Sequence, residues 1–289
     1  MIQRREKGLM KVAVTGASGF IGQYVLNELE KRKIETIAIT RNANNFNNFP
    51  WLKDIIEFDI SNPKPDDFET IHRPDVLIHL AWDGLPQYKS NRHFEIELLK
   101  QYNFLKNLIQ NGLSSLIVTG TCFEYGMQYG ELREDFPTLP NNPYGYAKDA
   151  LRRQLEFLQS ELKFSLTWTR LFYTYGEGQH QGSLYPQLKE AVLRGDPTFN
   201  MSGGEQLRDY LPVEEIARLI VLIACKKANF GIVNICSGTP VSIRYLVERW
   251  LRENQWKISL NLGHYPYSDY EPMAFWGSRE KLNGILKTM

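Results

Sequence analysis

The run Lys11-Val-Ala-Val-Thr-Gly-Ala-Ser-Gly-Phe-Ile-Gly22 decides the fold of this chain of 289 residues. Its first five residues are mostly apolar or β-branched and predict a buried strand, and an amphipathic stretch ending near Arg32 follows the last glycine. Gly16 permits a tight turn, Gly19 lets the backbone approach a pyrophosphate at the positive end of a helix, and Gly22 lets that helix pack close to the strand. Strand, glycine turn and helix in this order indicate a dinucleotide-binding site.

Short apolar segments alternate with helical patterns through the first half of the chain, which predicts βαβ units. The expected strands are residues 11–15, 35–40, 55–58, 76–80, 115–119 and 165–171, and the expected helices are residues 22–32, 92–110 and 144–162. We therefore expect an α/β fold with a Rossmann-type, doubly wound, mostly parallel sheet.

Beyond Gly176 the alternation weakens, and residues 184–194 and 243–253 look helical between loops rich in Gly, Pro and aromatic residues. The expected division is a dinucleotide-binding domain over residues 10–171 and a smaller C-terminal substrate-binding lobe over residues 172–289. A segment near residues 207–235 should return to the first domain, beginning with a helix after Pro212.

Tyr144 and Lys148 stand four residues apart at the start of the expected helix 144–162. Residues at i and i+4 lie on one helix face, so the phenol and the ammonium can share a site. A free tyrosine has a pKa near ~10, and a neighbouring cation lowers it. Tyr144 is therefore expected to act as a general acid whose pKa is lowered by Lys148.

The bulk properties narrow the partners and the compartment. The net charge of +1 implies no polyanionic partner such as nucleic acid. The three cysteines have no metal-like spacing and form an odd set, which favours a reducing cytoplasm and no metal site. No apolar run approaches the ~20 residues of a membrane span. Residues 1–8 are polar and basic, so we expect an extension rather than a signal peptide, with the fold beginning near Met10.

Further landmarks follow the glycine turn in order: His79-Leu-Ala81, Thr119-Gly-Thr121, Glu124-Tyr-Gly126, Tyr144 with Lys148, Arg170-Leu-Phe-Tyr-Thr-Tyr-Gly176 and Arg208-Asp-Tyr-Leu-Pro-Val213. With these landmarks the chain resembles the extended short-chain dehydrogenase/reductases, the family of nucleotide-sugar epimerases, dehydratases and reductases. The resemblance runs from about Met10 to Leu286 and implies a nicotinamide cofactor and a nucleotide-sugar substrate.

The resemblance implies that Thr121, Tyr144 and Lys148 are the catalytic residues. Thr121 would hydrogen-bond the substrate oxygen that Tyr144 protonates, and Lys148 would also bond the nicotinamide ribose. His79 is expected to be structural, and Asp59 matches an acid that contacts adenine. The residues assigned to the cofactor site are Gly16, Ser18, Gly19, Phe20, Ile21, Gly22, Arg41, Asp59, Ile60, Leu80, Ala81, Thr119, Tyr144 and Lys148.

The end of the second expected strand reads the 2′ position of the cofactor. NAD-binding proteins place an Asp or Glu there, whereas this chain has Ile39-Thr-Arg41. An arginine can pair with a 2′-phosphate through two hydrogen bonds. The sequence therefore favours NADP(H), with NAD(H) as the alternative and a solvated loop arginine as the structural interpretation of Arg41.

The second half carries the substrate signals. Arg208 matches the family arginine that binds the sugar-nucleotide diphosphate, and its structural alternative is an ion pair with Asp209 or Glu205. Tyr173 stands where the family usually has an Asn, which puts that sugar-phosphate contact in question. The residues expected to bind substrate are Trp82, Thr121, Tyr144, Arg170, Tyr173 and Arg208, with Asp83, Tyr88 and Trp276 as further lining.

The absence of one pair of acidic residues bears on which reaction of the family to expect. Sugar-nucleotide 4,6-dehydratases carry Asp-Glu directly after the catalytic Ser or Thr, because eliminating water needs an acid and a base. Here those positions hold Cys122 and Phe123, and Glu124 lies one place too far to be assumed a substitute. A dehydratase is therefore not expected.

The leading hypothesis is an NADPH-dependent reductase of a nucleotide-activated 4-keto-6-deoxy sugar, making a deoxyhexose for cell-surface glycans. The run Gly120-Thr-Cys-Phe-Glu-Tyr-Gly126 resembles that of dTDP-4-keto-6-deoxyglucose reductases, which favours dTDP. The alternatives are a 4-epimerase and, from another class, a non-catalytic NADP-sensing regulator. In the family, the helices that match residues 92–110 and 144–162 pair with their symmetry copies, so a homodimer is expected. Ile96, Leu99, Leu105, Leu151, Leu155 and Leu158 supply apolar positions on them.

Overall fold

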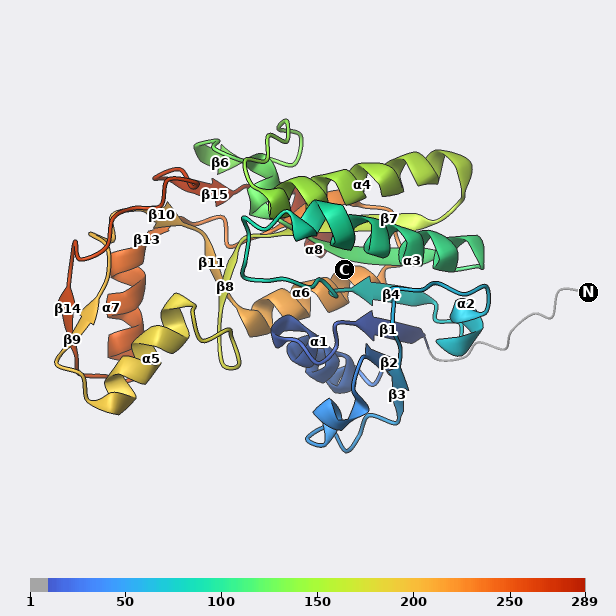
Figure 1. Ribbon diagram of the computed structural model, residues 1–289, viewed down its shortest axis with the longest axis horizontal. Helices are drawn as coiled ribbons and strands as arrows, with labels where there is room; N and C mark the ends of the chain where they lie inside the picture. Colours follow the sequence, from blue (N-terminus) through green and yellow to red (C-terminus); the bar gives the residue numbers. More distant parts are fainter. Residues whose placement is uncertain (1–9, 289) are drawn as a thin grey trace, which may run out of the picture.

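A parallel sheet of seven strands forms the centre of the molecule in the computed structural model, which describes residues 10–288 (Figure 1). The strand order is β12-β7-β5-β4-β1-β2-β3, and every neighbouring pair is parallel. The strands are β1 Lys11–Thr15, β2 Glu35–Thr40, β3 Asp54–Glu57, β4 Val76–His79, β5 Ser115–Thr121, β7 Ser165–Leu171 and β12 Gly231–Ile235. The expected doubly wound α/β fold is confirmed.

The order of the strands reverses between β1 and β4, which lie side by side although two strands separate them in the chain. Connections leave in opposite directions from such a point, so a crevice opens at the carboxyl ends of the two strands. Gly16 follows β1 and Leu80 follows β4, so both lie at this crevice.

Helices cover both faces of the sheet (Figure 1). Side chains alternate along a strand, so Val12 and Val14 pack on one face while Ala13 packs on the other. The first face is covered by α1 Phe20–Lys31, α6 Val213–Cys225 and α8 Glu280–Lys287. The second face is covered by α2 Asp67–Thr70, α3 Leu98–Gln110 and α4 Pro143–Glu161.

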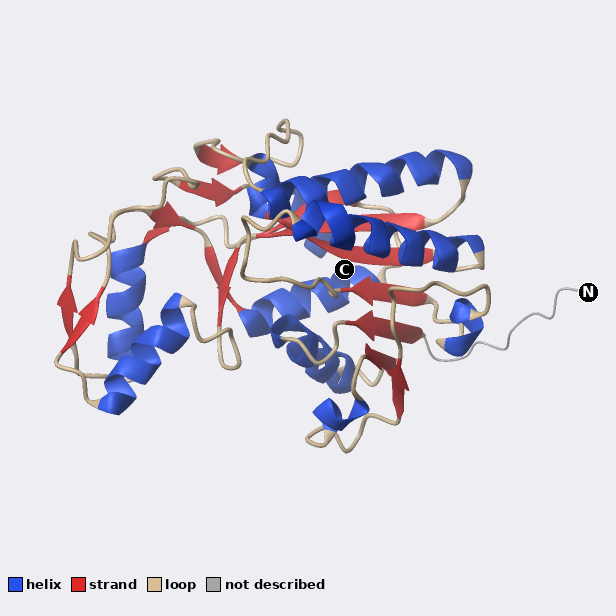
Figure 2. Ribbon diagram, in the orientation of Figure 1, coloured by secondary structure: helices blue, strands red, loops and turns tan. Residues whose placement is uncertain are grey.

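A hydrophobic cluster separate from the two faces of the central sheet lies in the part of the chain that follows β7, drawn at the left of Figure 2. There Trp250 and Leu246 of one helix pack against Leu188 and Ala191 of another. The helices are α5 Leu184–Arg194 and α7 Ile243–Glu253, and the paired strands are β9 Thr198–Asn200 with β14 Ser259–Asn261. Three small two-stranded sheets link this part to the rest: β8 Tyr173–Tyr175 with β11 Tyr210–Pro212, β10 Leu207–Arg208 with β13 Val241–Ser242, and β6 Gly130–Leu132 with β15 Phe275–Gly277.

Most expected elements agree with the structure within two residues, but the helix expected over residues 92–110 differs at its start. It opens with a π-helical turn, η2 His93–Glu97, before α3 begins. Strand β12 returns to the sheet beside β7, whereas the division into two domains stays a prediction. The extension expected over residues 1–8 lies outside the described residues.

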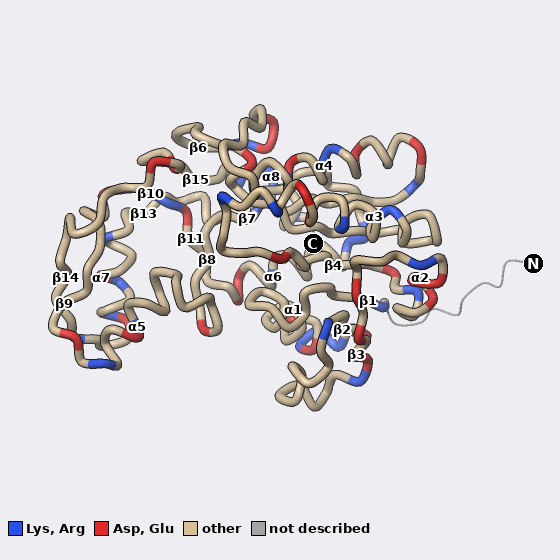
Figure 3. The backbone as a smooth tube through the Cα atoms, viewed as in Figure 1, with Lys and Arg blue, Asp and Glu red and all other residues tan. Residues whose placement is uncertain are grey.

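Charges of both signs are interspersed along the described chain (Figure 3). None of the helices within residues 10–288 is long and apolar enough to cross a membrane. No group of three or more His, Cys, Asp or Glu residues in the same range is arranged to hold a metal ion. Cys122, Cys225 and Cys236 are free thiols.

Candidate active site

The glycine turn between β1 and α1 is shaped to hold a phosphate group. Gly16 has a φ of 66°, and a Cβ there would lie 2.8 Å from the backbone nitrogen of Ala81. A Cβ on Gly22 would collide with the carbonyl oxygen of Gly16. The first turn of α1 carries no acidic side chain, so the positive end of its dipole faces the turn unopposed. These features fit the pyrophosphate of a dinucleotide.

A cleft runs from the glycine turn to the aromatic side chains of the second half of the chain. We divide it into a turn part, a central part and an aromatic part. Leu80 and Trp82 line both the turn and the central part, and Tyr88 and Tyr173 line both the central and the aromatic part, so the three parts are continuous.

Most of the predicted site residues line this cleft. The turn part includes Gly16, Ser18, Gly19, Arg41, Asp59, Ile60, Leu80, Ala81, Trp82 and Asp83. The central part includes Phe20, Ile21, Gly22, Thr119, Thr121, Tyr144 and Tyr173. Lys148, Arg170, Arg208 and Trp276 are not among the residues that line the three parts.

Tyr144 and Thr121 both line the central part of the cleft. Tyr144 lies in the first turn of α4, which Asn142 caps by accepting a hydrogen bond from the backbone nitrogen of Gly145 at 2.9 Å. Thr121 ends β5 and caps the short helix η3 Cys122–Tyr125. Both side chains are therefore fixed by helix N-termini, at the edge of the sheet where the crevice opens.

The protonation of Tyr144 differs from the expectation. Its pKa is raised above the ordinary value, first by burial and then by the neighbouring Tyr88, Glu124 and Cys122. The net shift in the pKa of Tyr144 is therefore opposite to the one expected from Lys148, because aromatic rings enclose the phenol. The rings of His93 and Tyr88 lie 5.3 and 5.6 Å from it, centroid to centroid.

Lys148 lies beneath Trp82 rather than in the cleft. Its ammonium nitrogen is 4.2 Å from the centroid of the indole, a distance at which a cation is attracted to the ring face. The indole nitrogen donates a hydrogen bond to Nδ1 of His93 at 3.0 Å, and Nε2 of His93 bonds the carbonyl oxygen of Gln87. Burial lowers the pKa of Lys148 to about 7, although the nearby Glu124 and Glu97 oppose this effect.

The structural interpretation of His79 agrees with its surroundings. The ring is fully buried, with Nδ1 bonded to the hydroxyl of Thr15 and Nε2 to the side-chain oxygen of Gln101, each at 2.8 Å. Burial lowers the pKa of His79 to about 3, and the positive charge of Lys148 adds to this. His79 therefore links β1, β4 and α3 as a neutral side chain.

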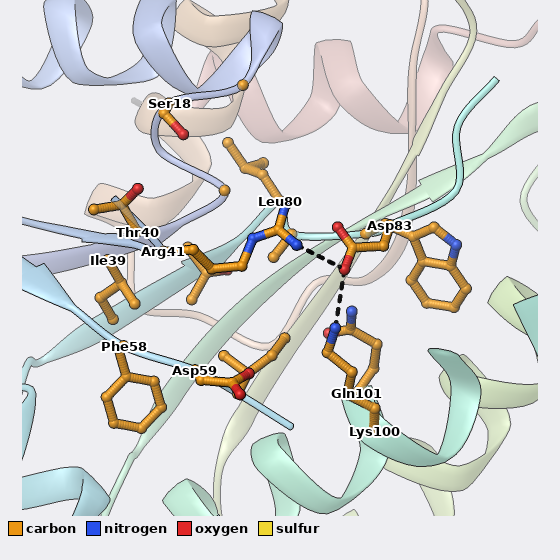
Figure 4. Close-up of a pocket in the computed structure, with 16 residues that line it drawn as sticks. Ser18, Ile39, Thr40, Arg41, Phe58, Asp59, Leu80, Asp83, Lys100 and Gln101 are labelled. Atoms are coloured by element: carbon orange, nitrogen blue, oxygen red, sulfur yellow. Dashed lines mark hydrogen bonds and ion pairs between the residues drawn. The ribbon is translucent and has the colours of Figure 1, made fainter. Parts of the chain in front are cut away.

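Arg41 lies at the turn part of the cleft, in the position expected for reading the cofactor ribose (Figure 4). Its guanidinium contacts Asp83 at 3.2 Å, and the same carboxylate oxygen contacts Lys100 at 3.0 Å. Asp59 lies nearby, and hydrogen bonds from Ser61 lower the pKa of its carboxyl. Two carboxylates (Asp59 and Asp83) and two cations (Arg41 and Lys100) therefore share this end of the cleft, and the sequence indicated only the arginine for the 2′ position.

Arg170 is fully buried in β7 and lies away from the cleft. Its Nε bonds Glu124 at 2.5 Å, and its guanidinium stacks 4.5 Å from the ring centroid of Tyr125. Glu124 also accepts hydrogen bonds from the indole of Trp168 and the backbone nitrogen of Thr121. This geometry favours a structural role for Arg170, and its binding of substrate stays a prediction without support from its position.

Arg208 is also buried, and its partner is Glu271 rather than Asp209 or Glu205. The guanidinium bonds Glu271 at 3.0 Å and stacks 4.6 Å from the ring centroid of Phe275. Asp209 instead accepts hydrogen bonds from backbone nitrogens, including that of Ser237. Glu271 lines the aromatic part of the cleft, so Arg208 stands directly behind the cleft wall.

Tyr173, which replaces the usual Asn, lies at the junction of the central and aromatic parts. Its hydroxyl is buried beside Glu271 and Arg208. Burial raises its pKa well above the ordinary value, so the phenol is neutral.

The positions of a dehydratase acid and base hold no carboxylate. Cys122 is buried, and burial raises the pKa of its thiol. The ring of Phe123 packs against Tyr88 and Tyr144. The carboxylate of Glu124 forms an ion pair with Arg170, so Glu124 does not replace the missing acid and base.

No sequence pattern indicated that His93, Glu97 and Glu271 lie at or beside the site. The first two lie in the π-helical turn η2, whose extra residue per turn cannot be read from a hydrophobic pattern. Glu271 lies in an irregular segment before β15 that has no periodic signal.

The sequence matches the model of the NAD dependent epimerase/dehydratase family over residues 12–236. It is 30% identical over 274 residues to dTDP-6-deoxy-L-talose 4-dehydrogenase (NAD(+)) of Aggregatibacter actinomycetemcomitans, covering 93% of this chain and 100% of that protein. It is 25% identical over 254 residues to dTDP-4-dehydro-6-deoxyglucose reductase of Escherichia coli, covering 82% and 79%.

Among solved structures, the fold is similar to that of UDP-glucuronic acid 4-epimerase from Bacillus cereus in complex with UDP-glucuronic acid and NAD. The TM-score is 0.81 at 21% identity, over 97% of this chain and 94% of that one. At this identity the likeness concerns the fold.

Proposed function

The chain belongs to the NAD dependent epimerase/dehydratase family, and on that premise we propose that it reduces a nucleotide-activated 4-keto-6-deoxy sugar with a nicotinamide cofactor. The observation that carries the proposal is that Thr121 and Tyr144 line the same part of the cleft that begins at the glycine turn, with the ammonium of Lys148 against the ring face of Trp82. The family contains enzymes with several outcomes, so the residues around Tyr144 decide between them.

A bound nicotinamide would supply the hydride that the reduction requires. The hydroxyl of Thr121 would hold the sugar carbonyl oxygen, and Tyr144 would give it a proton. Burial raises the pKa of Tyr144, so the phenol is protonated at neutral pH, which is the state from which ketone reduction starts. The positive charge of Lys148 would stabilise the phenolate left after the transfer.

The lining of the central part suits a 6-deoxy sugar. Leu85, Pro86, Phe123 and Phe172 give it an apolar wall, against which a methyl group at C5 of the sugar can pack. Both relatives in sequence are named for dTDP-linked deoxysugars. We therefore propose a dTDP-linked substrate and a 6-deoxyhexose product, of the kind used in cell-surface glycans.

For the cofactor we propose a preference for NADP(H), because Arg41 can turn from Asp83 to a 2′-phosphate. Its side chain is 73% exposed, so this motion costs little packing. One observation favours NAD(H) instead, since the carboxylate of Asp83 at the same end of the cleft can accept hydrogen bonds from ribose hydroxyls. The relative from Aggregatibacter actinomycetemcomitans also carries NAD(+) in its name.

Incubation with a panel of nucleotide 4-keto sugars and either reduced cofactor tests the proposal. Net loss of reduced cofactor, with one product per cofactor consumed, is the expected result. A 4-epimerase would convert a nucleotide sugar without net consumption. A chain that binds cofactor tightly yet turns over no sugar in the panel would favour the sensing alternative and contradict the reductase.

A further inference from the structure

One wall of the cleft is formed by the loop that follows β4, residues 82–88, which we call the wall loop. Trp82 lines the turn part and the central part, Leu85 lines the central part, and Tyr88 lines the central and aromatic parts. The wall loop is irregular, so its position depends on contacts with the elements around it rather than on a ladder of backbone hydrogen bonds.

His93 makes hydrogen bonds to both ends of the wall loop. It is the first residue of η2, and its side chain is fully buried. The indole nitrogen of Trp82 donates to Nδ1 of His93 at 3.0 Å, and Nε2 of His93 bonds the carbonyl oxygen of Gln87 at 3.0 Å. The backbone between these two residues passes close to the ring, since a Cβ on Gly84 would lie 3.2 Å from Cε1 of His93.

These two partners allow only one form of the imidazole. An indole N–H can only donate a hydrogen bond, and a carbonyl oxygen can only accept one. Nδ1 of His93 must therefore be the acceptor, and Nε2 must carry the hydrogen. A second proton on Nδ1 would face the N–H of Trp82 and break that bond, so only the neutral ring holds both ends of the loop.

The surroundings of His93 favour this neutral form. Burial lowers the pKa of the ring, the charges of Lys148 on α4 and Arg92 before η2 lower it further, and Glu97 in the same turn opposes them. The ring of Tyr144 on α4 lies 5.3 Å away, and this phenol is neutral because burial raises its pKa. The electrostatics and the hydrogen bonds therefore select the same state at pH 7.

The charged side chains on and beside the wall loop pair with other groups. Asp83 contacts Lys100 at 3.0 Å, and Lys89 contacts Asp269 at 3.6 Å. The groups that the loop offers to His93 are therefore an uncharged indole and an uncharged carbonyl.

The wall loop contacts both Tyr144 and Lys148. The ring face of Trp82 lies 4.2 Å from the ammonium of Lys148, and its ring centroid lies 6.0 Å from that of Tyr144. The carbonyl oxygen of Tyr88 accepts a hydrogen bond from the backbone nitrogen of Tyr144 at 3.2 Å. A shift of Trp82 would remove the ring face from the ammonium and reshape the wall of the cleft.

We propose that His93 is a positioning residue, which holds both ends of the wall loop and thereby sets Trp82 against Lys148 and Tyr144. His93 is not among the residues that line the three parts of the cleft, so it acts through Trp82. The hold on the loop needs only the two hydrogen bonds, whereas its effect on turnover rests on the proposed function. Separate experiments test these two points.

Nitrogen-15 NMR of the free protein tests the hold on the loop, because it distinguishes the two neutral tautomers of histidine and follows their protonation. We expect His93 in the Nε2–H form at pH 7.5, its signal assigned by its loss in His93→Gln or, if that variant does not fold, in His93→Asn. Trp82→Phe keeps an aromatic ring but removes the indole donor, so it should raise the pKa of His93 by about half a unit or more.

The matched control in these spectra is His72→Asn. His72 has a side chain that is 51% exposed, and asparagine tolerates its positive φ of 59°. This variant should leave the signal of His93 unchanged. An Nδ1–H tautomer of His93 at pH 7.5, or an unchanged pKa in Trp82→Phe, would overturn the inference.

Steady-state kinetics of the wild type, His93→Gln, Trp82→Phe and the double variant test the effect on turnover. The amide nitrogen of a glutamine stands as far along the side chain as Nε2, so His93→Gln can still donate to Gln87 while it loses the acceptor for the indole. Each single variant should lower kcat about tenfold. The double variant should lower it no further, because both changes remove the same bond. Losses that multiply to about a hundredfold would mean that the two residues act separately, against the inference.

The pH profile of kcat gives a second kinetic test. In the wild type kcat should fall as pH drops through the pKa of His93, because the protonated ring releases Trp82. The side-chain oxygen of His93→Asn can accept from the indole at every pH, so this variant should have a lower plateau without that fall. The same acid fall in both proteins would contradict the inference. If the wild type turns over no sugar, the proposed function fails, while the NMR experiment still decides whether His93 holds the loop.

Discussion

Tyr144 shows how burial decides the direction of proton transfer at a single residue. The spacing to Lys148 predicts a phenol made more acidic, whereas the rings around it raise its pKa. The phenol can therefore give up a proton only when a new oxyanion beside it is a stronger base, which a ketone becomes as it accepts hydride.

Tyr144→Phe should abolish turnover while leaving cofactor affinity nearly intact, because only the transferable proton is removed. Steady-state kinetics and a fluorescence titration of the cofactor measure the two effects. Tyr146→Phe is a matched control, since Tyr146 is 53% exposed and lies outside the cleft. A Tyr144→Phe protein with more than about a tenth of wild-type turnover, a loss under ~1.4 kcal/mol of barrier, would remove Tyr144 as the acid.

At Arg41 the prediction concerns cofactor choice. NADPH should bind more tightly than NADH by about tenfold or more, because a charge-assisted contact to the 2′-phosphate contributes roughly 1.5–3 kcal/mol. Arg41→Asp should reverse the order by repelling that phosphate and accepting bonds from ribose hydroxyls. Lys53→Asp adds the same charge change at an exposed site outside the cleft. Equal wild-type affinities for the two cofactors would contradict the prediction.

At the scale of elements, residue patterns predicted the central sheet better than its connections. The apolar segments predicted the bounds of β1, β2, β4 and β7 to within one residue. Parallel strands are buried on both faces, so each one needs a continuous apolar stretch of sequence. The π-helical turn η2, the sheet strand β12 and the short strands β6, β8 to β11 and β13 to β15 were not foreseen. The pairing of these strands depends on residues far apart in the chain.

In the candidate site, too, some features were predictable from the sequence and others were not. The glycine turn, Thr121 and Tyr144 were predictable because each sits at an element terminus with its own sequence signature. Arg170 and Arg208 match family positions, yet only the structure shows that Glu124 and Glu271 hold them. Sequence spacing therefore located the residues but not their partners, because a partner is set by packing between distant segments.

His79 ties three elements together, and it makes their association sensitive to acid. Its pKa is about 3 in the fold and ~6.5 when unfolded, so its contribution is complete above pH ~6.5 and is lost as pH falls toward 3. Between pH 6 and pH 5 the wild type should lose roughly 1 kcal/mol more unfolding free energy than His79→Gln. Urea unfolding at the two pH values measures this difference. Parallel losses in the two proteins would show that His79 is not the neutral link.

At the scale of the whole molecule, the pair Arg208 and Glu271 joins β10 to the segment that precedes β15 beside the aromatic part of the cleft. Arg208→Ala should lower Tm, because it leaves Glu271, whose side chain is 15% exposed at the cleft, without its cation, at a cost of roughly 1.5–3 kcal/mol. It should also raise the substrate KM about tenfold if the guanidinium reaches the diphosphate through the cleft wall. Differential scanning calorimetry and kinetics well below Tm measure these effects.

Glu271→Ala is the matched control for Arg208, since it breaks the same ion pair but keeps the cation. We expect its Tm to fall while KM rises less than in Arg208→Ala. A KM unchanged in Arg208→Ala, alongside a lower Tm, would assign Arg208 a purely structural role.

The prediction of a homodimer depends on which apolar side chains of the fold are exposed to solvent. Leu105, Leu151, Leu155 and Leu158 were expected to include surplus for an interface, but all four are buried against the sheet. The surplus instead consists of Ile96 and Leu99, which are 50% and 59% exposed, with Tyr146 and Phe157 on α4, at 53% and 74%. Two adjacent helices that expose such side chains favour burial against a second copy.

We therefore expect a homodimer formed through α3 and α4. A C2 contact repeats every residue, so one charge introduced at Leu99 would face the partner's apolar surface twice. Leu99→Glu should convert the dimer to a monomer with little change in Tm of the isolated chain, because the side chain is already 59% exposed. Leu193→Glu, at a 76% exposed position on α5, should leave the dimer intact. Light scattering at micromolar concentration measures the masses, and a wild type with the mass of a monomer would contradict the prediction.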